Sequence, residues 1–184
     1  MVTHGIISHI NYVIKESQSN MDNEWQMNVG QENASSARAA TQLPPDASVN
    51  PDSSQIIFQT KQIKIEIAAL PNAFDDARFH MAGLDDPRII TPLGANITLT
   101  LYNQDGKNTH GWKLIRRTPP FADPKNAASE PPAFPGAEIS PIPPHQHGDA
   151  HFTVNQPGIY TYICPELGDN DIGLYGIWEV APGH

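Results

Sequence analysis

Hydrophobic and polar residues alternate along two stretches of this chain. In residues 61–67, Ile63, Ile65 and Ile67 fall on one face of an extended chain, and polar side chains fall on the other. Residues 96–102 repeat the pattern with isoleucine and leucine. Because successive side chains of a strand point to opposite sides, both stretches are predicted to be half-buried strands.

Shorter strand-like runs occur in the rest of the chain and are separated by turn-forming residues. They are rich in β-branched, aromatic and aliphatic residues, which pack well on a pleated sheet. The runs lie at 56–58, 78–81, 88–90, 112–116, 151–154, 159–164 and 175–180. Many short strands with turns between them are typical of β-sandwiches and barrels, so the sequence predicts an all-β domain of one of these two forms.

Two parts of the chain lack this pattern. The segment 118–144 is rich in proline, which removes ladder donors, so we expect a long surface connection with only short strand pieces. Residues 1–54 are polar, rich in Asn, Ser, Gln and Ala, and without sustained periodicity. They are predicted to be an extension, disordered or bound to a partner, that precedes a domain at 55–184. A short helix within 34–42 is the alternative for part of it.

Composition and charge exclude several classes of protein. The 20 acidic and 11 basic residues give a formal net charge of −9, which argues against nucleic acids and anionic membranes as partners. No apolar run reaches the ~18 residues that span a bilayer, and residues 1–12 contain no visible export signal. Enzyme motifs such as HExxH or a phosphate-binding glycine loop are not found, so we expect no enzymatic activity.

Cys164 is the only cysteine of the chain, and it ends the predicted strand 159–164. It shares one face of that strand with Tyr160 and Tyr162. A thiolate and a neutral imidazole held by separate strands suit a soft, electron-transferring copper ion, and His110 at the start of another strand could supply the imidazole. An isolated cysteine is also commonly a small buried hydrophobe, so both interpretations stay open.

Several short motifs between residues 55 and 180 resemble the cupredoxin family of blue-copper proteins. The motifs are IEIAALP at 65–71, DPRIITPLGA at 86–95, THGW at 109–112, TPPF at 118–121, ISPIP at 139–143, FT at 152–153 and GIYTYIC at 158–164. Their order and spacing agree with the family over roughly two-thirds of the chain. The resemblance implies a Greek-key β-sandwich that carries electrons with a single copper ion.

The resemblance also implies the copper ligands, which are a histidine on an early strand, the cysteine, and a second histidine and a methionine in the loop after it. These four positions carry His110, Cys164, Asp169 and Leu174 here, so the last two depart from the family. A leucine leaves the metal without an axial ligand, which raises the reduction potential. Asp169 would add a hard, negative donor that favours the oxidised metal and also suits zinc.

A copper-free descendant of the fold is the main alternative to a copper carrier. In that case Asp169 would be an ordinary turn residue, and residues 1–54 with the proline-rich segment would contact a larger complex. For the carrier, the resemblance implies a redox partner such as a cytochrome, docked on an exposed apolar patch near His110, Leu167 and Leu174. It also implies a periplasmic or other extracytoplasmic location.

A cluster of histidines suggests a weaker alternative, metal storage or delivery. His145, His147 and His151 form a His-x-His-x3-His pattern after two prolines. Residues i and i+2 of an extended chain face the same way, so His145 and His147 are predicted to be able to chelate one ion together. A solvated loop whose histidines titrate near neutral pH is the other interpretation of the pattern.

Overall fold

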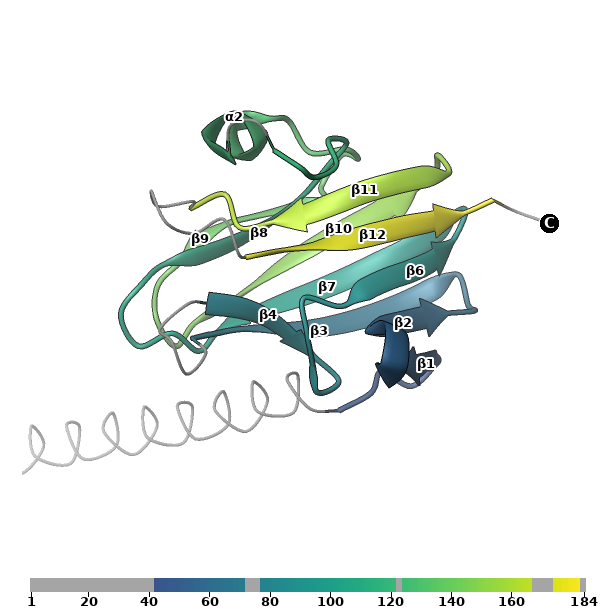
Figure 1. The fold of residues 1–184 in the computed structure, drawn as a ribbon, viewed down its shortest axis with the longest axis horizontal. Coiled ribbons are helices and arrows are strands. Elements are labelled where there is room, and N and C mark those ends of the chain that lie inside the picture. The colour runs from purple at the N-terminus through teal and green to yellow at the C-terminus, as the bar shows by residue number, and fades with distance from the viewer. Residues whose placement is uncertain (1–41, 72–76, 122–123, 167–173, 183–184) are drawn as a thin grey trace, which may run out of the picture. The chain divides into compact units, whose positions relative to one another are not determined.

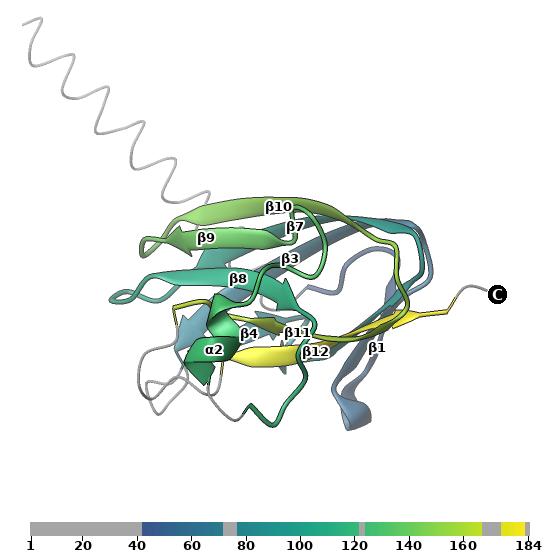
Figure 2. The same ribbon diagram turned by 90° about the horizontal axis from the view of Figure 1, so that it is seen from above.

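The computed structural model describes residues 42–71, 77–121, 124–166 and 174–182. These residues form two β-sheets that pack on each other, as two perpendicular views show (Figures 1 and 2). A short helix, α2, lies outside the sheets (Figure 1). None of the helices in these ranges is long and apolar enough to cross a membrane.

The strands belong to two mixed sheets. In chain order the elements are β1 (Ala47–Asn50), the 3-10 helix η1 (Pro51–Ser53), β2 (Gln55–Phe58), β3 (Gln62–Pro71), β4 (Ala77–Met81), β5 (Leu84–Asp85), β6 (Arg88–Pro92), β7 (Ala95–Asn103), β8 (His110–Ile115), α2 (Pro124–Ser129), β9 (Glu138–Ile142), β10 (His147–Val154), β11 (Gly158–Ile163) and β12 (Tyr175–Ala181). The seven-stranded sheet has the order β1-β2-β6-β12-β11-β8-β9, and the five-stranded sheet has the order β10-β7-β3-β4-β5. Strand β6 runs parallel to β2 and β12, and β3 runs parallel to β7.

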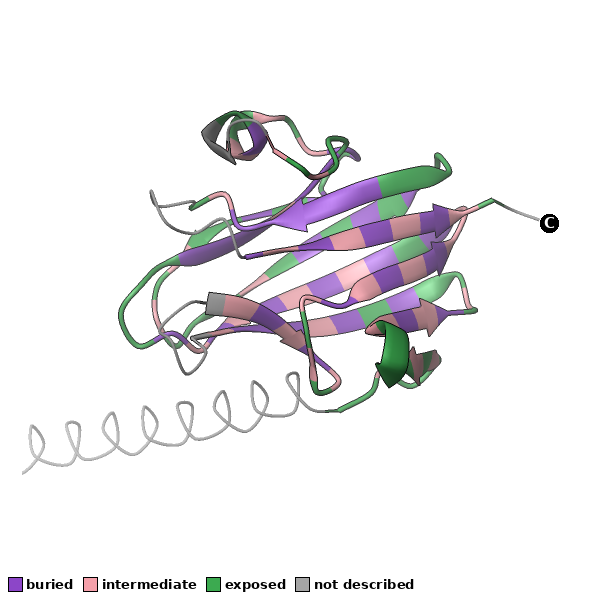
Figure 3. Cartoon of the chain, in the orientation of Figure 1, coloured by how far each residue is buried: buried purple, intermediate pink, exposed green. Residues whose placement is uncertain are grey.

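The alternating stretches supply the core between the sheets. Strands β3 and β7 pair in register, so Ile63 lies beside Ile97 and Ile65 beside Leu99, and all four side chains are buried. Buried positions continue to alternate with intermediate or exposed ones along most strands (Figure 3). The predicted all-β class is confirmed, and the form is a sandwich of two mixed sheets rather than a closed barrel.

Aromatic side chains fill the centre of this core. Trp112 stacks on Phe152 with ring centroids 5.7 Å apart, and its ring meets Trp178 edge-on at 5.9 Å. Tyr162 stacks on the same indole at 6.4 Å. Since Trp112 and Tyr162 lie on β8 and β11, these contacts hold the two strands that carry the predicted cysteine and histidine ligands against one rigid centre.

The seven-stranded sheet begins before the predicted domain boundary at residue 55. Strand β1 pairs antiparallel with β2, which places Ala47 opposite Phe58 and Val49 opposite Ile56. Ala47 and Val49 are partly buried against the core, but a strand of four residues inside a polar segment is too short to show periodicity in the sequence. Residues 1–41 lie outside the described residues, so for them the extension stays a prediction.

The described part of the proline-rich segment contains strand β9, a short strand piece of the kind expected there, and helix α2, which the sequence did not predict. Ala127 of α2 packs with Ile115 and Ile163, which lie on the outer face of β8 and β11. Strand β9 pairs antiparallel with β8, and a bulge falls between His110 and Trp112. Strand β11 is therefore covered on both faces near Cys164, by the core on one side and by α2 on the other.

Candidate metal centre

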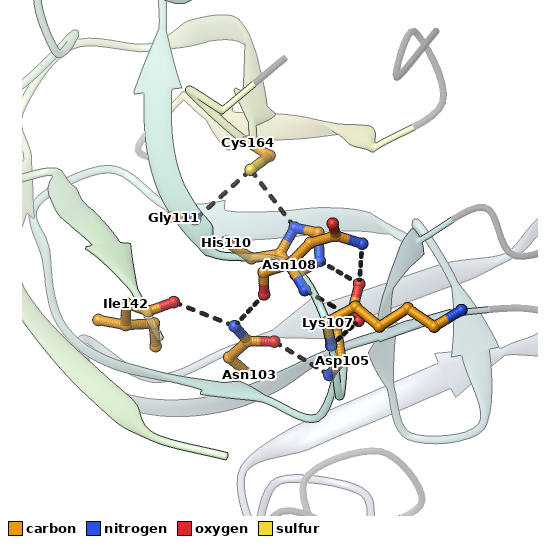
Figure 4. Close-up of polar contacts among 8 residues, drawn as sticks. All are labelled: Asn103, Asp105, Lys107, Asn108, His110, Gly111, Ile142 and Cys164. Carbon is orange, nitrogen blue, oxygen red and sulfur yellow. Dashed lines mark hydrogen bonds and ion pairs between the residues drawn. The ribbon is translucent and has the colours of Figure 1, made fainter. Parts of the chain in front are cut away.

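The ends of β8 and β11 bring Cys164 and His110 together. These strands are antiparallel neighbours, with Thr161 opposite Ile115 and Ile163 opposite Lys113. The first residue of β8 and the residue after β11 therefore lie at the same end of the sheet. Cys164 Sγ is 3.8 Å from His110 Nδ1 (Figure 4), and both residues are buried, with His110 3% exposed.

Gly111 brings a backbone donor to the sulfur. Its N–H donates to Cys164 Sγ at 3.4 Å. A Cβ at this position would stand 2.8 Å from the carbonyl oxygen of Ile139 and 2.9 Å from Cγ of Pro165, so only glycine lets the backbone approach so closely. A hydrogen bond to sulfur stabilises the thiolate form, which is the form that binds metals.

The far side of the His110 ring faces a buried carboxylate. His110 Nε2 is 2.9 Å from Asp105 Oδ2, and Asp105 is 4% exposed (Figure 4). Three loop groups also donate to this carboxylate: the N–H of Lys107 at 2.8 Å, the N–H of Asn108 at 3.2 Å, and Nδ2 of Asn108 at 2.9 Å. Asp105 therefore holds both the loop before β8 and the imidazole ring of His110, the first residue of β8.

These hydrogen bonds keep the carboxylate ionised. Burial by itself raises the pKa of Asp105, but the hydrogen bonds from His110, Asn108 and the loop amides outweigh it and lower the pKa to about 2. A carboxylate that is ionised at neutral pH can only accept hydrogen bonds, so the proton between Asp105 and His110 belongs to Nε2. When the ring is neutral, its lone pair then lies on Nδ1, the atom that faces Cys164.

Asn103, the last residue of β7, holds the base of the same loop. Its Oδ1 accepts the N–H of Asp105 at 3.0 Å, while its Nδ2 donates to the carbonyl oxygens of Asn108 at 2.9 Å and Ile142 at 3.0 Å. Asn103 is 1% exposed. It joins the loop between β7 and β8 to strand β9, so the position of the histidine depends on both sheets.

The chain is similar in sequence to known rusticyanins, although no protein-family model matches it. It is 26% identical to rusticyanin of Acidithiobacillus ferrooxidans over 123 residues, which cover 66% of this chain and 77% of that protein. It is 25% identical to rusticyanin of Acidithiobacillus ferridurans over 128 residues, which cover 66% of this chain. The chain spans 64% of the length of that second relative, just under two thirds.

Solved structures agree with this similarity at the level of the fold. A structure of reduced rusticyanin superposes with a TM-score of 0.60 and 20% identity, covering 74% of this chain and 89% of that one. Rusticyanin from Thiobacillus ferrooxidans gives a TM-score of 0.60 and 22% identity, covering 76% of this chain and 88% of that one. The chain resembles rusticyanin in sequence and has the cupredoxin fold. The family resemblance seen in the motifs is thus confirmed.

Two residues in the sequence after Cys164, Asp169 and Leu174, depart from the cupredoxin ligand pattern. Leu174 is 2% exposed and belongs to the same hydrophobic cluster as Cys164, whose N–H donates to the Leu174 carbonyl oxygen at 3.1 Å. Asp169 and Leu167 lie outside the described residues. The described part of the predicted docking patch, His110 and Leu174, is buried rather than exposed.

The structure does not bring the three histidines of the predicted secondary site together in a chelating group. His145 lies in a turn with φ of 61°, so the chain from His145 to His147 is not extended, in contrast to the prediction. His147 and His151 lie on β10, where His151 contacts Thr98 Oγ1 at 3.3 Å and the His147 ring lies 5.7 Å from that of Tyr102. Among the described residues, no group of three or more His, Cys, Asp or Glu side chains could hold a metal ion.

The two described donors fit a shared metal ion. Metal bonds of about 2.3 Å to sulfur and about 2.0 Å to imidazole nitrogen reach a common ion when the two donor atoms stand less than about 4.3 Å apart. The 3.8 Å between Cys164 Sγ and His110 Nδ1 meets this condition. A neutral His110 ring with its proton on Nε2 would present a lone pair at Nδ1, and such an ion requires this form together with a thiolate sulfur.

The sequence pointed to both residues of the Cys164–His110 contact but not to the residues behind them. Asn103 to Gly106 have the composition of an ordinary turn, because Asn, Asp and Gly are the usual residues of turns. An aspartate five positions before a predicted histidine ligand was the available signal. It is a weak one, because most aspartates in turns bond the amides of their own loop, as Asp105 also does.

Proposed function

We propose that this cupredoxin is a single-copper electron carrier in which Cys164 and His110 are two of the metal ligands. The observation that carries the proposal is the 3.8 Å between Cys164 Sγ and His110 Nδ1, both buried at one end of the sandwich. Similarity to rusticyanin, a copper protein, supports it. The proposed role is to carry electrons rather than to catalyse a reaction.

The residues around the two donors suit electron transfer. A bound copper ion would supply reversible one-electron chemistry. The chain would hold its two donors at nearly the same separation in both oxidation states, because β8 and β11 are fixed to one packed aromatic centre. The Gly111 N–H donates to sulfur and withdraws electron density from it, which favours the reduced metal.

For the remaining positions we propose Asp169 as the third ligand and Leu174 as an apolar cap over the metal. Buried Leu174 and its carbonyl contact with the Cys164 N–H support the second assignment. The loop spacing of the family is the only support for the first. An anionic oxygen ligand favours Cu(II) and lowers the reduction potential, whereas the missing axial ligand favours Cu(I) and raises it. The same donors also suit zinc.

The test is to add Cu(II) to the purified full-length chain and to record its visible spectrum. We expect an intense thiolate-to-copper charge-transfer band that disappears in Cys164→Ala. His151→Ala is the matched control and should keep the band, because His151 is exposed on β10 and contacts Thr98. A colourless protein without bound metal by mass spectrometry would refute the carrier.

A copper-free interaction or structural subunit is the second candidate. It is favoured by the two departures from the ligand pattern and by the lack, among the described residues, of any group of three metal-binding side chains. The part of the predicted extension that precedes β1 would then serve as a contact arm. The spectrum separates the two candidates, and metal uptake that survives Cys164→Ala but fails in a His145→Ala, His147→Ala double variant would instead favour metal delivery.

The partner of the carrier is proposed to be a protein redox centre such as a cytochrome, met in the periplasm or another extracytoplasmic compartment. A partner would approach the copper from the end of the sandwich where β8 begins. Residues 106–109 are exposed there, directly before His110. The net charge of −9 favours a partner with a basic docking surface.

A further inference from the structure

A buried aspartate outside the proposed ligand set contacts the imidazole of His110. Asp105 precedes β8, is 4% exposed, and meets Nε2, the ring nitrogen that faces away from Cys164. The ligand pattern of the family and the proposed function leave this residue without a role. Its surroundings are nevertheless more completely organised than an ordinary turn requires, because the ring and the loop both donate to it (Figure 4).

Each carboxylate oxygen of Asp105 receives two donors. Oδ1 accepts the backbone N–H groups of Lys107 and Asn108 at 2.8 and 3.2 Å. Oδ2 accepts Nδ2 of Asn108 and Nε2 of His110, both at 2.9 Å. All four groups around the carboxylate are donors. The neutral amide of an asparagine would not fit here, because its NH₂ group would face a donor in either orientation.

The consequence for the histidine is a fixed ring and a fixed tautomer. An oxygen that already accepts one hydrogen bond can stabilise Nε2 only when that nitrogen carries the proton. The other ring nitrogen then presents its lone pair toward Cys164 Sγ, 3.8 Å away. A negative charge behind the ring also makes Nδ1 a stronger electron donor toward a metal.

We propose that Asp105 is the positioning residue that makes His110 a donor through Nδ1, by holding the ring, fixing the proton on Nε2 and adding charge behind it. The effect of Asp105 on copper rests on the proposed function, whereas its effect on the orientation and tautomer of the His110 ring does not. In the loaded protein the added charge stabilises Cu(II) relative to Cu(I), so it lowers the reduction potential.

The experiment compares the full-length chain with Asp105→Asn, which keeps the shape of the side chain and removes its charge. Asp149→Asn is the matched control. It makes the same chemical change on the exposed face of β10, where Asp149 accepts a hydrogen bond from Thr100. Both variants remove one negative charge, so any difference between them comes from where the charge is removed and not from the net charge.

The first readout needs no metal. Long-range ¹H–¹⁵N NMR of the metal-free parent protein at about pH 8, above the usual range for histidine, is expected to show His110 with its proton on Nε2. In Asp105→Asn we expect the ring to shift toward the Nδ1–H form, and in Asp149→Asn to stay unchanged. A proton on Nδ1 in the parent protein overturns the proposal, and this measurement decides even if Asp105→Asn does not fold.

The second readout uses copper. We expect Asp105→Asn to bind Cu(I) about 10- to 100-fold more weakly in competition with a chromogenic chelator, and to have a higher reduction potential than the parent and Asp149→Asn. Equal affinity and equal potential in all three proteins would overturn the proposal while leaving the carrier intact. If the parent takes up no copper, the carrier fails, and the metal-free NMR result alone decides the role of Asp105.

Discussion

Two aspartates of this protein lie in opposite electrostatic surroundings. Asp105 accepts four hydrogen bonds, and its pKa falls to about 2 although burial opposes the change. Asp86 accepts one hydrogen bond from the Phe79 N–H at 3.0 Å and has Arg78 at 3.5 Å, but burial dominates and raises its pKa to about 7. The number of donors around a buried carboxylate thus decides whether it is ionised at neutral pH.

A pH-dependent contribution to stability follows for Asp86. Its pKa is higher in the folded chain than in the unfolded one, so the folded state binds the extra proton. The stabilisation is full below the unfolded pKa near 3.8 and is lost as the pH rises through about 7. Asp86→Asn removes the titration, so relative to the parent it should gain about 2–4 kcal/mol of unfolding free energy between pH 4 and 8.

Urea unfolding of both proteins at a series of pH values measures this difference. Asp149→Asn is the control, since that side chain is exposed on β10, and its difference from the parent should change little over the same range. A constant difference between Asp86→Asn and the parent would mean that Asp86 is ionised at all these pH values in the folded protein.

At the scale of elements, α2 depends on a strand of the seven-stranded sheet. Lys113 of β8 reaches past the end of the helix and donates from Nζ to the carbonyl oxygens of Ala128 at 3.1 Å and Glu130 at 3.3 Å. The last carbonyls of a helix lack partners within the helix, and a cation near them also interacts favourably with the helix dipole. One side chain therefore fastens α2 over Ile115 and Ile163.

Lys113→Met should loosen this attachment. Methionine keeps the apolar length of the side chain but cannot donate, so we expect a loss of about 1–2 kcal/mol in the free energy of unfolding. Lys64→Met on β3 is the matched control, because Lys64 is exposed and the change there should cost little. Chemical denaturation of the three proteins tests the prediction, and equal losses in both variants would contradict it.

At the scale of the whole molecule, the domain includes residues before the boundary that the sequence suggested. Strand β1 gives β2 an antiparallel partner, and β2 carries the buried Ile56 and Phe58. Without β1, the backbone of β2 would form the edge of the sheet, with unpaired N–H and C=O groups and a less covered apolar face. The first described strand is thus part of the fold and not of a preceding arm.

Truncation tests this boundary. A chain of residues 55–184 should be less stable than one of residues 42–184 by about 1–3 kcal/mol, because β2 loses its partner and the core loses the cover of Ala47 and Val49. Thermal unfolding followed by circular dichroism compares the two. Identical midpoints would show that β1 contributes nothing and would restore the boundary at residue 55.

The sequence predicted the strands with clear periodicity and missed elements whose stability comes from their neighbours. Residues 61–67 and 96–102 alternate by themselves, and they became parts of β3 and β7. Strand β1 is four residues long and α2 is six, too short for a periodic pattern, and both are held mainly by contacts with residues distant in the sequence.

For the candidate site, the sequence alone supplied the prediction that Cys164 and His110 are metal ligands, and the resemblance to the cupredoxin family. It did so because Cys164 is unique and the motifs around it keep their order. Only the tertiary structure decided that Cys164 and His110 meet, that Asp105 lies behind the imidazole, and that His145, His147 and His151 form no chelating group. The physical reason is that the antiparallel pairing of β8 and β11 brings Cys164 to His110, 54 positions away in the sequence, and such pairing leaves no mark on local composition.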